Sequence, residues 1–82
     1  MSKEMTAKEM FNEIGYYSHD NVDDCLTFVK KQGSAVYYIE FYLEEFSYES
    51  YGIAKGHNIN NPIDVKMHSA IAQQIKELGW LE

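Results

Sequence analysis

The sequence predicts an α+β fold with the order α-β-β-β-α, in which N- and C-terminal helices pack on one face of a three-stranded antiparallel sheet. The helices are predicted by two amphipathic stretches, each ending in a glycine followed by an aromatic residue, at Gly15-Tyr16 and Gly79-Trp80. The sheet is predicted by alternating apolar and polar side chains in the tyrosine-rich middle of the chain. A chain of 82 residues has the length of a single domain, residues 1–82.

The first helix is expected from Ala7 to Ile14. Thr6 and Glu9 have the spacing of a capping box, in which each side chain accepts a hydrogen bond from the other residue's amide. The apolar residues that follow fall on one helical face: Ala7, Met10, Phe11 and Ile14. A polar connection is expected over residues 16–24.

The first strand is expected from Cys25 to Lys30, with the heavier alternate residues Leu26 and Phe28 favoured for the core. Residues 31–34 then form a turn, in which Gly33 can take a positive φ. The second strand is the clearest element because its side chains divide into two alternating sets. The core-facing set is Ala35, Tyr37, Ile39, Phe41 and Leu43, and the outward set is Val36, Tyr38, Glu40, Tyr42 and Glu44.

The third strand is expected from Phe46 to Tyr51 or Ile53, paired so that Phe41 lies opposite Tyr48. Two glutamates suit a tight hairpin turn poorly, so a longer loop or a bulge near Glu45 is expected. Residues 52–62 are expected to form a polar loop. Asp64 is the expected N-cap of a second helix that runs to Leu78, with a buried stripe of Met67, Ile71, Ile75 and Leu78.

Charge and composition exclude several classes of partner. Seven lysines, no arginine and 13 acidic residues give a net charge of −6, which disfavours direct binding to nucleic acid or to anionic membranes and favours a basic protein partner. Cys25 is the single cysteine, so no intramolecular disulfide forms, as is typical of a reducing cytoplasm. There is no secretory signal and no apolar run of about 18 residues, so we expect a cytoplasmic protein.

The strongest functional feature is the predicted outward sheet face. Tyr38 and Tyr42 would supply rigid aromatic contact area, and Glu40, Glu44 and Glu49 would supply charge complementary to a basic partner. The competing interpretation is that tyrosine is simply favoured in strands and keeps this face hydrated.

No residue pattern predicts catalysis, a cofactor or a metal. His19, Asp20, Asp23 and Asp24 lie close together in the sequence, but their spacing matches neither an EF-hand nor a zinc motif. We therefore expect no enzymatic activity, and a small metal-dependent enzyme is the least favoured alternative.

Two groups of residues at the ends of the chain form a recognisable pattern: Met5–Phe11 with Ile14–Tyr16, and Asn61–Asp64 with His68, Ala70–Ile71, Gln73–Ile75 and Glu77–Trp80. In these residues the chain resembles small uncharacterised accessory proteins encoded by phages and prophages of Gram-positive bacteria. These are capping and packing residues, so no functional residue is transferred. The resemblance implies an intracellular accessory protein that acts by binding a host or phage protein.

The leading hypothesis is therefore a non-enzymatic protein-interaction module that modulates a host or phage protein through the acidic, tyrosine-rich sheet face. A variant is a homodimer that buries this face or the edge of the first or third strand. The alternative is an acidic nucleic-acid mimic, in which Asp and Glu side chains occupy the groove of a nucleic-acid-binding protein.

Overall fold

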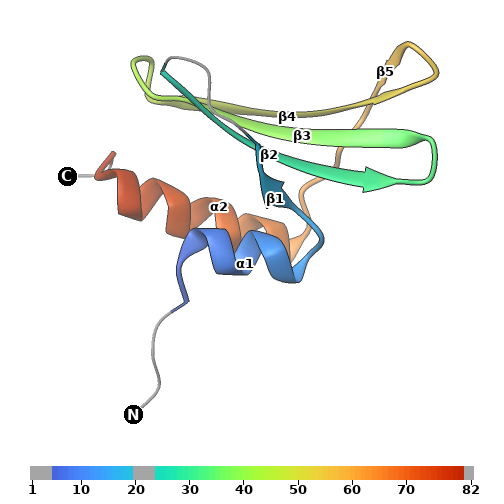
Figure 1. The fold of residues 1–82 in the computed structure, drawn as a ribbon. Coiled ribbons are helices and arrows are strands. Elements are labelled where there is room, and N and C mark those ends of the chain that lie inside the picture. The colour runs from blue at the N-terminus through green and yellow to red at the C-terminus, as the bar shows by residue number, and fades with distance from the viewer. Residues whose placement is uncertain (1–4, 20–23, 81–82) are drawn as a thin grey trace.

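Two helices lie side by side under one face of an antiparallel sheet in the computed structural model, which describes residues 5–19 and 24–80 (Figure 1). The elements are α1 (Ala7–Glu13), β1 (Tyr17–Ser18), β2 (Cys25–Gln32), β3 (Ala35–Tyr42), β4 (Ser47–Ala54), β5 (His57–Ile59) and α2 (Val65–Leu78). The strand order is β1-β2-β3-β4-β5, with every neighbouring pair antiparallel. The predicted α+β class and the placement of both helices on one face are confirmed.

The predicted strand number is wrong, because the sheet has five strands rather than three. The first additional strand, β1, is only two residues long and lies in the segment expected to be a connection. The second, β5, lies in the expected polar loop and follows a turn at Lys55 and Gly56, which have φ values of 53° and 78°. Such a pair of positive φ angles defines a tight hairpin turn, in which Asn or Asp is more usual than Lys at the first position.

β2 is longer than expected, β3 ends at Tyr42 rather than at Glu44, and the expected pairing of β3 with β4 is kept. Phe41 lies opposite Tyr48, and Phe28 lies opposite Ile39. The turn between β2 and β3 is tighter than expected, because only Gly33 and Ser34 separate the strands and Gly33 takes a φ of 62°. Between β3 and β4 the loop covers residues 43–46, which confirms the expected longer connection.

Both helix ends follow the expected capping pattern. The Thr6 hydroxyl accepts from the Glu9 amide at 3.2 Å, and the Glu9 carboxylate accepts from the Thr6 amide at 2.9 Å. At the other end of α1 the Tyr16 amide donates to the Phe11 carbonyl, and at the end of α2 the Trp80 amide donates to the Ile75 carbonyl. Each of these two bonds spans six residues across a glycine with positive φ, which is the pattern of the Schellman motif.

The core lies between the helices and the inner face of the sheet and is built on three phenylalanines. The Phe11 ring from α1 stacks on Phe28 of β2 at 4.3 Å, and both rings meet Phe41 of β3 edge-on at 6.3 Å. Met67, Ala70 and Ile71 of α2 complete this core. In the described part of the chain, neither helix has the length and apolar character that a bilayer span requires.

Candidate functional site

The face of the sheet opposite the helices has no described helix or strand packed over it and carries most of the predicted site (Figure 1). Strand register sets its side chains in rows across β2, β3 and β4. One row is Val29, Tyr38 and Tyr51, and the next is Thr27, Glu40 and Glu49. Tyr42 follows Glu40 along β3, with Ser47 opposite it. We call Tyr38, Glu40, Tyr42, Glu49 and Tyr51 the outer-face cluster.

The outer-face tyrosines pack against each other rather than projecting freely into solvent. The Tyr38 ring stacks on the Tyr51 ring with 5.1 Å between centroids and 21° between planes. Val29, beside Tyr38 in the register, is only 3% exposed although it faces away from the helices. The stacked Tyr38 and Tyr51 rings thus contact each other on the outer side of the sheet, in the same row as the buried Val29.

Tyr42 connects two carboxylates that face each other across β3 and β4. Its hydroxyl lies 2.9 Å from an oxygen of Glu40 and 2.9 Å from an oxygen of Glu49. One phenolic proton therefore serves two acceptors, and it reduces the repulsion expected between like charges at directly opposed positions. The register places Thr27, Tyr38, Ser47 and Tyr51 around the two glutamates, so no lysine adjoins them in the sheet.

Both hydroxyls beside these carboxylates are held in the protonated form. Burial, followed by hydrogen bonds to Glu40 and Glu49, raises the pKa of Tyr42 far above its ordinary value. Burial and the charge and hydrogen bonding of Glu40 raise the pKa of Tyr51 to about 12. The outer-face cluster therefore combines protonated phenols with carboxylates, and the Tyr42 proton is already donated to Glu40 and Glu49.

Four of the five predicted site residues lie together on this face, and Glu44 does not. Because β3 ends at Tyr42, Glu44 lies in the exposed loop that leads to β4. There its side chain interacts with Asp24, and a hydrogen bond and the charge of that neighbour raise the pKa of Glu44. Glu44 belongs to the end of the sheet rather than to the outer-face cluster.

The sequence analysis missed Tyr51 as a member of the cluster. Its signal is strand alternation, since Tyr51 is two residues after Glu49 and therefore lies on the same face. Both strand ends considered in the sequence include Tyr51, so the alternation was already present there, and β4 extends it to Ala54.

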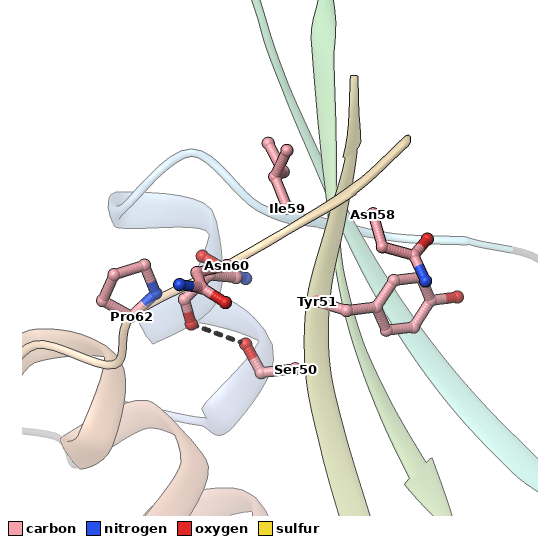
Figure 2. A pocket seen from close by; sticks show the side chains of 7 residues that line it. Ser50, Tyr51, Asn58, Ile59, Asn60 and Pro62 are labelled. Carbon is pink, nitrogen blue, oxygen red and sulfur yellow. Dashed lines mark hydrogen bonds between the residues drawn. The ribbon is translucent and has the colours of Figure 1, made fainter. Parts of the chain in front are cut away.

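A separate hollow of about 530 Å³ lies where the chain leaves β5 and turns toward α2, beside Ser50 and Tyr51 (Figure 2). The Ser50 hydroxyl donates to the Asn61 carbonyl at 3.0 Å, and the Asn61 amide donates to the Tyr16 hydroxyl at 2.9 Å. These bonds hold the connector between β5 and α2 beside β4. An apolar hollow of about 250 Å³ lies between the helices, where its lining includes Met5, Met10 and Val65.

Within residues 5–19 and 24–80, no three His, Cys, Asp or Glu side chains converge as a metal site would require. Asp20 and Asp23, which the sequence places near His19 as possible metal ligands, lie outside the described residues. No family model, curated protein or solved structure matches the chain. The function is therefore argued from the geometry of the surface.

Proposed function

We propose that the protein is a non-enzymatic interaction module whose outer-face cluster binds a basic surface of a partner protein, a host or phage protein in the context that the resemblance implies. The observation that carries the proposal is the arrangement of Tyr42 between Glu40 and Glu49 beside the stacked Tyr38 and Tyr51 rings. Aromatic side chains held in place before binding lose little entropy at an interface, and paired carboxylates attract cationic side chains.

The test compares two glutamine variants of the tagged protein in affinity capture from host-cell lysate. Glu40→Gln with Glu49→Gln removes both outer-face charges while leaving amide oxygens that still accept from Tyr42. Glu13→Gln on α1 removes one exposed carboxylate far from this face and is the matched control. We expect the double variant to bind the captured partner at least about tenfold more weakly, because losing one partner of a charge pair that is buried and hydrogen-bonded in the complex costs roughly 2–5 kcal/mol.

Loss of binding in the Glu13 variant as well, or equal binding by all three proteins, would contradict the proposal. A partner that DNA displaces, and whose binding falls steeply with salt, would instead favour the nucleic-acid-mimic alternative. Circular dichroism and thermal unfolding of each variant establish that the fold is retained.

A further inference from the structure

The sheet has an open edge directly beside the outer-face cluster. β4 pairs with β3 along its full length, but with β5 only from Gly52 to Ala54. A two-residue hairpin loop is closed by a hydrogen-bonded pair, which here is Ala54 and His57. Every second residue before Ala54 on β4 therefore directs its backbone N–H and C=O groups to the same side as Ala54, toward β5. Ser50 and Tyr48 continue that alternation. Among the described residues, no backbone bond outside the strand ladders reaches either of them.

Two hollows follow this edge and give an added strand a place to lie. The first is the hollow beside Ser50 and Tyr51 (Figure 2). The second, about 460 Å³, lies beside Tyr48 and is lined also by Ile63, Asp64, Val65 and His68. Both have β4 on one side and the connector to α2, or the first residues of α2, on the other.

The second hollow is apolar enough to receive a side chain. Tyr48 is 39% exposed, Ile63 41% and Val65 80%, although all three are large and hydrophobic. Exposed apolar residues gathered beside an unpaired strand edge are features of a peptide-binding site. The edge thus combines unused backbone hydrogen-bonding groups with an apolar surface.

Charge defines the chemistry of the segment that fits there. In a strand added to β4, the residue opposite Tyr48 points to the inner face and toward the second hollow. Its two neighbours point to the outer face, one opposite Glu49 and the other opposite Ser47. Glu40 lies directly across from Glu49 and adds its charge to the same place. Apolar residues are therefore favoured at the inward positions and basic residues at the outward ones.

We propose that the open edge of β4 binds an extended segment of the partner protein, in which basic and apolar residues alternate, as an additional strand of the sheet. This inference rests on the proposed function, since Glu40 and Glu49 belong to the outer-face cluster. A second copy of the chain is disfavoured as the occupant, because two chains of net charge −6 would bring four such glutamates onto one continuous sheet face.

The test uses a dye-labelled synthetic peptide of about seven residues, a usual strand length, in which lysine and valine alternate. Two N-methylated forms separate edge pairing from simple charge attraction. Methylation at the valines blocks the amides that would face Tyr48 and Ser50, whereas methylation at the lysines blocks amides that face away and is the matched control. Fluorescence anisotropy at fixed ionic strength gives each dissociation constant.

We expect the parent and lysine-methylated peptides to bind with similar affinity, and the valine-methylated peptide to bind at least about tenfold more weakly, because it loses backbone hydrogen bonds. We also expect hydrogen exchange at the Tyr48 amide to slow when the parent peptide binds.

Equal binding of all three peptides would overturn the edge inference while leaving the outer face as a charged binding surface. Absence of binding by any of them would also overturn it. A Tyr48 amide protected without peptide, in a protein that sediments as a dimer, would show that the edge is occupied by a second copy. The glutamine variants tested above report on the proposed function independently of these outcomes.

Discussion

At the scale of single residues, the Tyr42 hydroxyl is the contact on which the outer face depends most. Glu40 and Glu49 are directly opposed across β3 and β4, which is an unfavourable arrangement for like charges. The hydroxyl that donates between them supplies the compensating interaction without a lysine. Tyrosine at position 42 therefore lets the face carry two adjacent carboxylates and remain folded.

Replacing Tyr42 with phenylalanine tests this interaction. We expect Tyr42→Phe to lower the free energy of unfolding by about 1 kcal/mol, the typical net value of one hydrogen bond. Adding Glu49→Gln to this variant should recover part of the loss, because only one charge then remains. Urea unfolding measures the free energy of unfolding of the single and the double variant. The control is Tyr38→Phe, which keeps the ring stacked on Tyr51. A Tyr42→Phe variant as stable as the wild type would contradict this role.

The faces of the site residues could be predicted from the sequence, but their contacts could not. Alternation with a period of two places Tyr38, Glu40 and Tyr42 on one face whatever the length of the strand. The approach of Glu49 to Tyr42 depends on register, and register depends on the loop of residues 43–46. The expected placement of Glu44 on the outward strand face was wrong, because it assumed that the alternation continued past the end of β3 at Tyr42.

At the scale of elements, β5 is held to β4 by close packing at a glycine. A Cβ atom added to Gly52 would lie 2.8 Å from Ile59 of β5 and 2.8 Å from the Tyr37 ring of β3. The Tyr37 ring and the Ile59 side chain thus occupy the space that a side chain at position 52 would need. The two added strands escaped prediction because β1 and β5 are short and their residues are mostly polar, so neither shows a clear apolar alternation.

Gly52→Ala is the corresponding test at this scale. We expect it to reduce the free energy of unfolding by about 2 kcal/mol, because inserting a methyl group into a filled site costs roughly 1–3 kcal/mol. In an Ile59→Ala background the same change should cost less, since one of the two obstructing side chains is shortened. The four proteins form a double-mutant cycle measured by urea unfolding. Strictly additive effects would show that Gly52 and Ile59 do not share this space.

At the scale of the whole molecule, the fold separates its structural face from its candidate binding face. Both helices and the phenylalanine core lie on one side of the sheet, so no described helix covers the outer-face cluster (Figure 1). Beyond its pairing with β5, the edge of β4 has no described strand beside it. This division could be predicted from the sequence, because two amphipathic helices and one apolar strand face require a single shared core. The hollows along β4 could not be predicted, because they depend on the course of the connector after β5.

The most direct test of the proposed function is to map the surface that the captured partner covers, using amide chemical shifts of the isotope-labelled protein. The account predicts that the largest changes fall on β3 and β4, including Glu40, Tyr42, Tyr48 and Glu49. Changes concentrated instead around Met5, Met10 and Val65, in the hollow between the helices, would contradict it.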